Sequence, residues 1–229
     1  KITARKTKIT LTTFPSVAEK IKNAVCVGAP IRSEALRTVK REENELLKML
    51  YATKSKEQNS SLNREKPILL VFGGGSGSQK INEFVKENLK QLLNYFDVIH
   101  ICGKGNEEKK QEGYLPLGFV SDMAQAYSAA SVVLARCGSN SAWEITARGL
   151  PALYVPLKKA TRGDQIENAR FFEEKKTCLT ADEDESDGKT ILSKLLELLR
   201  KKEFFAANAE KIFKADAGKK IAAYLNEYL

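Results

Sequence analysis

A continuous apolar run, ILLVF at 68–72, is followed directly by a glycine-rich stretch, and together they restrict the fold more than any other feature. Five apolar residues in succession, without alternation, are typical of a strand that is buried on both faces of a parallel sheet. Further short apolar runs follow, and helical segments separate most of them: DVIHI, LPLGF, SVVLA, PALYV and TCLT. Strands that alternate with helices predict an α/β fold, in which helices cover both faces of a parallel sheet.

The helices of this region follow from composition and from a repeat of about 3.6 residues. They are predicted at 80–95, 121–129, 140–148, 165–175, 189–200, 203–214 and 218–229. Ahead of residue 67 the pattern is weaker. It predicts short strands at 7–12 and 25–27, a helix over 34–51, and a linker or long surface loop at 53–66.

The composition excludes several classes of protein. Of 229 residues, 42% are hydrophobic and 29% are charged, which excludes a mainly disordered chain. No apolar run approaches the roughly 18 residues that span a membrane. The net charge is +9, but the basic residues are spread along the chain without interleaved aromatic residues, so nucleic-acid binding is not expected. Four scattered cysteines and one histidine argue against a zinc site or a disulfide framework and favour buried free thiols.

Two features that could suggest chemistry are interpreted as structural. The lone histidine, His100, lies in a predicted strand. The acidic run DEDESD at 182–187 lacks the glycine and the terminal glutamate of a calcium loop, so we expect a solvated turn.

The glycine-rich turn at 73–78 joins a predicted strand to a predicted helix. Its glycines permit the close approach of a ligand, and the free N–H groups at the start of the helix favour an anion such as a diphosphate. The turn is neither a P-loop nor a clean GxGxxG motif. It indicates either a phosphate site or a plain tight turn.

A second strand-to-helix turn, RCGSNSAWE at 136–144, carries a carboxylate just inside a helix. Ser139 or Asn140 can cap that helix, and Glu144 could accept two hydrogen bonds from the vicinal hydroxyls of a ribose. The alternative is a capping box, in which the glutamate satisfies only the backbone of its own helix. The motif alone favours the capping box.

Two further turns carry polar side chains. Asp164 and Gln165 could bond sugar hydroxyls, with Asn168 bracing the loop, or Asp164 could be an ordinary N-cap. Arg32 could reach a phosphate, although such an arginine is more often surface decoration. Ligands of parallel α/β sheets bind at the carboxyl ends of the strands, so these turns are where a site is expected.

In combination, these stretches resemble the carboxyl half of the family 28 glycosyltransferases that add N-acetylglucosamine to a lipid-linked bacterial cell-wall precursor. The matching stretches are VGAPIR, LLVFGGGSGSQKIN, HICGKG, GFVSDMAQAY, RCGSNSAWEITARGLPALYVP and DQIENA. The resemblance extends from about residue 7 to residue 229. It implies a Rossmann-like parallel sheet that forms the donor-binding half of the two-domain GT-B fold.

The resemblance implies a role for each turn. Arg32 would contact the donor diphosphate, the backbone of Val120 would meet the uracil, Glu144 would hold the ribose, and Gln165 with Asp164 would bond the sugar. The implied substrate-binding residues are Arg32, Gly74, Gly75, Ser76, Phe119, Val120, Ser139, Asn140, Ser141, Glu144, Asp164 and Gln165. The family usually has a serine where Gly75 stands, and often a histidine where Asp164 stands.

The implied activity is an inverting transfer from UDP-N-acetylglucosamine to lipid I, which forms lipid II in peptidoglycan synthesis. An Asp-x-Asp spacing occurs at 182–184, within the acidic run that is interpreted as a solvated turn, and neither a metal nor a cofactor is expected. The resemblance also implies a peripheral location on the cytoplasmic side of the bacterial cell membrane.

Members of this family carry an amino-terminal domain with a glycine-rich loop, a histidine that could activate the acceptor and a membrane-facing patch, and nothing in this chain matches that loop. We therefore expect residues 1–27 to be a remnant of that domain and residues 28–229 to be the UDP-sugar-binding domain. The catalytic residues are then expected outside this chain, so that the chain alone binds the donor without transferring it.

Three other functions would each leave a different mark on the sequence or on binding. A donor-binding subunit of a two-component lipid-linked N-acetylglucosamine transferase would start near the glycine-rich strand, whereas this chain matches further upstream. A UDP-sugar 2-epimerase would need several acidic and histidine residues in its cleft, and this chain has one histidine. A basic nucleic-acid-binding module would show steeply salt-dependent affinity.

Overall fold

The computed structural model describes residues 7–54, 66–74, 77–158 and 164–228, and its centre is a parallel sheet. The sheet has six strands in the order β5-β4-β3-β6-β7-β8, and every neighbouring pair is parallel. Its strands are β3 (Ile68–Phe72), β4 (Asp97–Ile101), β5 (Tyr114–Leu117), β6 (Val132–Ala135), β7 (Ala152–Tyr154) and β8 (Cys178–Thr180). The α/β class that the sequence predicts is confirmed.

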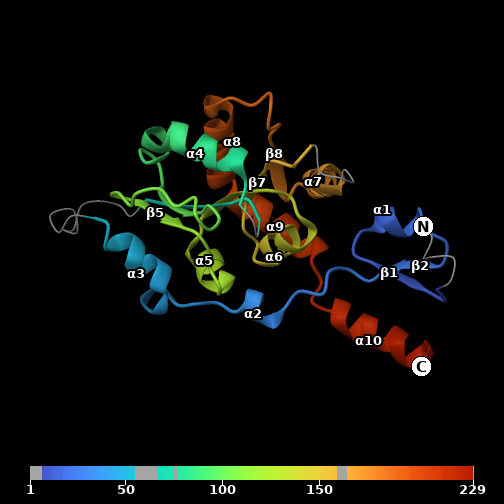
Figure 1. Ribbon diagram of the computed structural model, residues 1–229. Coiled ribbons are helices and arrows are strands. Elements are labelled where there is room, and N and C mark those ends of the chain that lie inside the picture. Colours follow the sequence, from blue (N-terminus) through green and yellow to red (C-terminus); the bar gives the residue numbers. More distant parts are fainter. Residues whose placement is uncertain (1–6, 55–65, 75–76, 159–163, 229) are drawn as a thin grey trace.

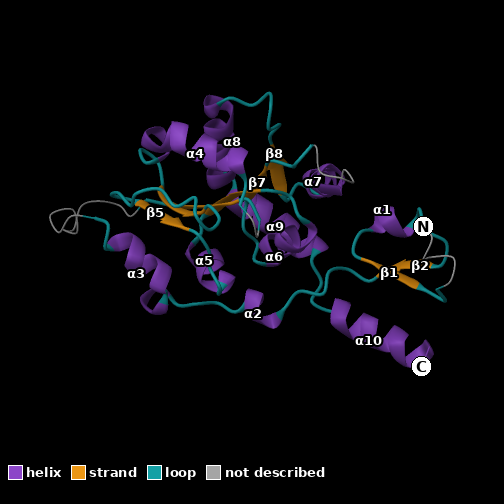
Figure 2. Ribbon diagram, viewed as in Figure 1, coloured by secondary structure: helices purple, strands orange, loops and turns teal. Residues whose placement is uncertain are grey.

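Helices cover both faces of the sheet, as Figure 2 shows. They are α3 (Glu45–Tyr51), α4 (Gln79–Leu92), α5 (Met123–Ala129), α6 (Ser139–Ala147), α7 (Asp164–Glu174), α8 (Gly188–Arg200) and α9 (Lys202–Ile212). The last helix, α10 (Ala217–Tyr228), lies away from the sheet in Figure 2. On one face Leu69 and Val71 pack with residues of α4 and α8. On the other face Leu70 and Phe72 pack with residues of α3, α5 and α6. Because successive residues of β3 face opposite cores, the whole strand is apolar.

The direction of the chain across the sheet reverses at β3. From β3 the chain proceeds outward through β4 to β5, and it then returns to β6 on the other side of β3 and proceeds to β8. Such a reversal leaves a crevice between the carboxyl ends of the two strands that flank it. The turns that follow β3 and β6 therefore meet at this position.

A small unit precedes the main sheet and is visible at the blue end of the chain in Figure 1. It consists of β1 (Thr10–Thr12), α1 (Pro15–Ala18) and β2 (Ala24–Cys26), and within the described residues its two strands pair only with each other. Phe14 anchors this unit, since its ring lies 5.7 Å from that of Trp143 and 5.2 Å from that of Phe171. Residues 28–39, which we call the strap, lead from this unit to the main body.

The prediction of a single helix over 34–51 is wrong. The structure has one helical turn, α2 (Ser33–Leu36), then extended backbone, a 3-10 turn at Arg41–Glu43, and only then α3. The carbonyls of Leu36 and Arg37 accept hydrogen bonds from the guanidinium of Arg148, so they do not continue a helix. The polar stretch 53–66 lies mostly outside the described residues.

The remaining predicted elements are present with shifted ends, and the first strand is shorter than predicted. None of the helices in the described part of the chain is both long enough and apolar enough to cross a membrane.

Candidate functional site

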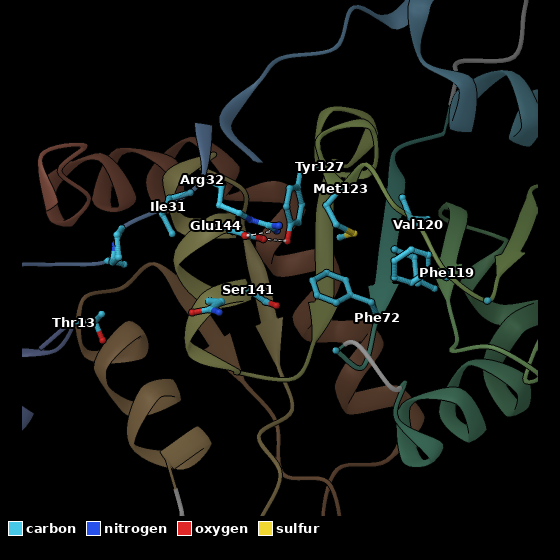
Figure 3. A pocket seen from close by; sticks show the side chains of 16 residues that line it. Thr13, Ile31, Arg32, Phe72, Phe119, Val120, Met123, Tyr127, Ser141 and Glu144 are labelled. Carbon is cyan, nitrogen blue, oxygen red and sulfur yellow. Dashed lines mark hydrogen bonds and ion pairs between the residues drawn. The ribbon is translucent and has the colours of Figure 1, made fainter. Parts of the chain in front are cut away.

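A pocket of about 590 Å³ opens where the chain reverses at β3. The carboxyl ends of β3 and β4, the start of α6, one side of α5 and the strap surround it (Figure 3). Its lining residues are Thr13, Ala29, Pro30, Ile31, Arg32, Phe72, Gly74, Ile101, Gly118, Phe119, Val120, Met123, Tyr127, Asn140, Ser141 and Glu144. The pocket combines apolar walls with a few convergent polar groups, as small-molecule sites commonly do.

Glu144 is the charged group on the inner wall of this pocket. Its side chain is only 10% exposed, and it accepts a hydrogen bond of 2.9 Å from the hydroxyl of Tyr127. The guanidinium of Arg32 lies 3.5 Å from its other carboxylate oxygen, and 75% of the arginine side chain is exposed (Figure 3). Burial, and then the Glu144 carboxylate, raise the pKa of Tyr127, which keeps the phenol protonated as a donor.

The capping-box interpretation of Glu144 is wrong. The N-cap of α6 is Gly138, which has no side chain, and no side-chain hydrogen bond caps this helix. Glu144 instead faces Tyr127 and Arg32. In the described part of the chain no capping side chain binds the first N–H groups of α6, which lie beside the pocket, and free N–H groups at a helix start favour an anion.

The turn after β3 is held against the turn after β4. Gly77 has a positive φ of 79°, and a Cβ atom there would lie 2.4 Å from the carbonyl oxygen of Cys102. The amide of Asn82 donates a hydrogen bond of 2.9 Å to the same oxygen. Gly74 lines the pocket, whereas Gly75 and Ser76 lie outside the described residues.

His100 links β4 to β5 and α4, which agrees with the structural role that the sequence predicts. Its ring nitrogens lie 3.0 Å from the hydroxyl of Tyr114 and 3.0 Å from the side-chain oxygen of Asn82. Burial lowers the pKa of His100 to about 4, so the ring is neutral near neutral pH.

Comparison with known proteins identifies the family. The model of the glycosyltransferase family 28 C-terminal domain matches residues 68–223, which is more than half of the chain.

The chain belongs to glycosyltransferase family 28. Three bacterial relatives share one description, UDP-N-acetylglucosamine–N-acetylmuramyl-(pentapeptide) pyrophosphoryl-undecaprenol N-acetylglucosamine transferase. The Clostridium tetani protein is 37% identical over 85% of this chain and 58% of its own length. The protein of Clostridium botulinum strain Loch Maree is 35% identical over 94% and 59%, and that of Oceanobacillus iheyensis is 39% identical over 84% and 52%. This family 28 chain thus spans between half and three-fifths of the length of these relatives.

Solved structures share the fold. MurG of Acinetobacter baumannii superposes with a TM-score of 0.68 at 21% identity, covering 98% of this chain and 61% of that protein. Os79 of O. sativa, solved with UDP, gives a TM-score of 0.70 at 15% identity, covering 100% of this chain and 57% of that protein. The family 28 chain therefore has the Rossmann-like architecture of one half of a GT-B glycosyltransferase.

The structure gathers most, but not all, of the sequence-predicted residues of this family 28 domain. The pocket contains Arg32, Gly74, Phe119, Val120, Asn140, Ser141 and Glu144. Phe119 stands on the rim with 60% of its surface exposed, and the Lys104 ammonium lies 5.6 Å from its ring centre. Ser139, Asp164 and Gln165 are not among the residues that line the pocket.

The first two side chains of α7 bond to backbone N–H groups of this family 28 domain. The side-chain oxygen of Gln165 accepts a hydrogen bond of 3.0 Å from the backbone N–H of Leu157, and Asp164 accepts one from the N–H of Gln165. Asn168 donates to the carbonyl oxygen of Cys137 at 3.0 Å and so braces the turn before α6. The loop at 158–163, which the sequence predicts it to brace, lies mostly outside the described residues.

The sequence analysis did not predict two polar features of the family 28 domain. Tyr127 lies one helical turn after Met123, and both side chains face the pocket, a spacing that could have indicated the shared face. The acidic run is not wholly solvated, because the Glu183 side chain is only 6% exposed and lies 2.7 Å from buried Arg136. Arg136 also bonds Ser78 and the carbonyl of Val155, and so joins the turns after β3, β6 and β7.

Proposed function

We propose that this chain is the donor-binding domain of a transferase that moves N-acetylglucosamine from UDP-N-acetylglucosamine to lipid I, which forms lipid II. The observation that carries the proposal is a buried carboxylate, Glu144, one turn behind an uncapped helix start in the pocket at the strand reversal. The descriptions of the three relatives support this donor and this acceptor.

The proposed donor pose follows from the chemistry of the pocket. Glu144 accepts hydrogen bonds from the two ribose hydroxyls, with Tyr127 orienting the carboxylate. The diphosphate meets the start of α6 and Arg32, which is mobile enough to exchange the carboxylate for a phosphate because it is mostly exposed. The uracil lies by Phe119 and the backbone of Val120, and the sugar extends toward Asp164 and Gln165.

The proposed role in transfer is to stabilise the leaving group. Cleavage of the sugar–phosphate bond places additional negative charge on UDP, and the α6 dipole and Arg32 act on that charge. The general base that activates the lipid I hydroxyl is assigned to the part of the relatives' length that this chain does not span. We expect no turnover of lipid I by this chain alone, and a radiolabelled transfer assay that shows turnover would contradict that division of labour.

We further propose that residues 1–27 belong with the acceptor-side domain, that residues 28–229 form the donor domain, and that the full-length enzyme works at the cytoplasmic membrane surface. The separate sheet of β1 and β2 supports this division.

Calorimetric titration with UDP-N-acetylglucosamine, UDP-glucose and UDP tests the proposal. We expect binding that is tightest for the acetylated sugar and weakened at least about tenfold by Glu144→Ala, since the substitution removes a charge-assisted hydrogen-bond acceptor. Glu167→Ala, on the exposed side of α7, is the matched control. If neither this chain nor a full-length enzyme bound any uridine nucleotide, the proposal would be wrong.

A further inference from the structure

The strap forms one wall of the pocket, yet it contains little regular structure. Four consecutive strap residues, Ala29–Arg32, line the pocket. The single turn α2 follows, and Arg37 leaves it with extended backbone at ψ 127°. Because the strap makes few hydrogen bonds within itself, its position depends on the elements beneath it.

Arg148, the C-cap residue of α6, holds the end of the strap that is further along the chain. One nitrogen of its guanidinium donates to the carbonyl oxygens of Leu36 at 2.9 Å and Arg37 at 3.1 Å. The other terminal nitrogen donates at 2.8 Å to the hydroxyl of Ser128 on α5. That hydroxyl in turn accepts a hydrogen bond of 3.0 Å from the backbone N–H of Val39. Arg148 and Ser128 thus bind the backbone of the strap at Leu36, Arg37 and Val39.

The helix that bears Arg148 also bears Glu144. The two side chains are four residues apart on α6, so they lie on one face of the helix. Glu144 meets Arg32 at the front of the strap, and Arg148 binds Leu36 and Arg37 behind it. The neighbouring helix α5 contacts both of these α6 residues, since Tyr127 bonds Glu144 and Ser128 bonds Arg148.

The strap has a second attachment, made by the side chain of Arg37. The side chain of Arg37 contacts Asp122, the N-cap residue of α5, but 55% of that arginine side chain is exposed. Exposed ion pairs hold a backbone weakly. Burial lowers the pKa of Arg148, consistent with a guanidinium withdrawn from solvent and engaged with fixed backbone acceptors.

We propose that Arg148 is a positioning residue, which fixes the strap so that Arg32 can reach the diphosphate of the donor. This inference rests on the proposed function of the pocket. Arg148 does not line the pocket, and it acts through the backbone of Leu36 and Arg37. The planar fork of arginine suits this task, since one group spans two carbonyls and a hydroxyl, and lysine cannot reproduce that geometry.

The test measures the dissociation constants of UDP and of uridine for Arg148→Met, Arg148→Lys, Arg32→Ala and the double variant Arg32→Ala with Arg148→Met. Arg200→Met, at the exposed end of α8, is the matched control. Circular dichroism checks that each variant is folded.

We expect Arg148→Met to weaken UDP binding about tenfold, with a smaller loss for Arg148→Lys, because an arginine–phosphate contact is misplaced. Uridine, which has no phosphate, should bind Arg148→Met as it binds the unsubstituted chain. In the Arg32→Ala background Arg148→Met should add little, because the two residues act through one contact. Any one of three results would overturn the inference and leave the proposed function standing. These are equal losses of affinity for uridine and UDP, additive losses of affinity in the double variant, and unchanged UDP binding by Arg148→Met. Failure of the unsubstituted chain to bind UDP would overturn the proposed function and the inference with it.

Discussion

At the scale of single residues, the protein separates groups that meet a ligand from groups that hold the ligand site in shape. Glu144 and Arg32 face the pocket, and the exposed arginine leaves the buried carboxylate only partly engaged. Arg136 and His100 instead bond to the chain itself. The partners of Arg136 lie on turns, and those of His100 lie on β5 and α4. The sequence presents all four as polar residues near glycine-rich turns, and only their partners distinguish the two roles.

His100 makes stability depend on pH in a defined direction. Its pKa is about 4 in the folded chain and about 6.5 when the chain is unfolded. Between these values the unfolded chain binds more protons, so the free energy of unfolding falls as the pH drops from about 6.5 toward 4, by up to about 3 kcal/mol. Urea unfolding at pH 7, 6 and 5 measures this loss. His100 is the only histidine. The His100→Gln variant should therefore be less stable at pH 7, but its free energy of unfolding should fall less when the pH is lowered. Equal acid sensitivity of both chains would contradict this role.

At the scale of elements, the strands and most helices of the main body could be predicted because their signals are local. The run at 68–72 is buried throughout, and five apolar residues suffice to indicate that. The helix predicted over 34–51 failed because its interruption comes from Arg148, which lies 112 residues beyond Leu36 in the chain. The buried position of Glu183 likewise depends on Arg136, and the orientation of Glu144 depends on Tyr127. Such pairings are set by the fold, and no local pattern records them.

The close contact between the turns after β3 and β4 can be tested with a pair of glycines. Gly77 and Gly105 have similar positive φ angles, 79° and 82°, but only at Gly77 would a Cβ atom meet backbone. Gly105→Ala should cost about 1 kcal/mol through backbone strain alone, and Gly77→Ala about 2–4 kcal/mol because the turn must also move. Urea denaturation of both variants gives the comparison. Equal losses of stability would argue against the contact with Cys102.

At the scale of the whole molecule, the six-stranded sheet with its two apolar layers is one body and the β1–α1–β2 unit is a smaller attachment. The unit shares no strand pairing with the main sheet in the described residues. Phe14 joins the two parts by inserting its ring among Trp143, Phe171 and Phe172. Trp143 precedes Glu144 on α6, so the attachment lies directly beside the proposed donor site.

Phe14→Ala should release this unit while the main body remains folded. The substitution removes a buried ring and its three aromatic contacts, a loss of about 3 kcal/mol or more. Trypsin should then cut within residues 7–27 at least about tenfold faster, and the emission of Trp143, the only tryptophan, should shift to longer wavelength. Val17→Ala, at an exposed position of α1, is the control. Unfolding of the whole chain together with the unit would contradict the two-part description.

The assignment of Glu144 to the ribose is the central claim, and one comparison of ligands tests it most directly. Calorimetry with UDP and 2′-deoxy-UDP, on the unsubstituted chain and on Glu144→Ala, isolates the contact between the carboxylate and the 2′-hydroxyl. The unsubstituted chain should bind UDP about tenfold more tightly than the deoxy ligand, as expected for a charge-assisted hydrogen bond. Glu144→Ala should bind the two ligands about equally. Discrimination that persists in the variant would contradict the assignment, because another group would then be reading the ribose.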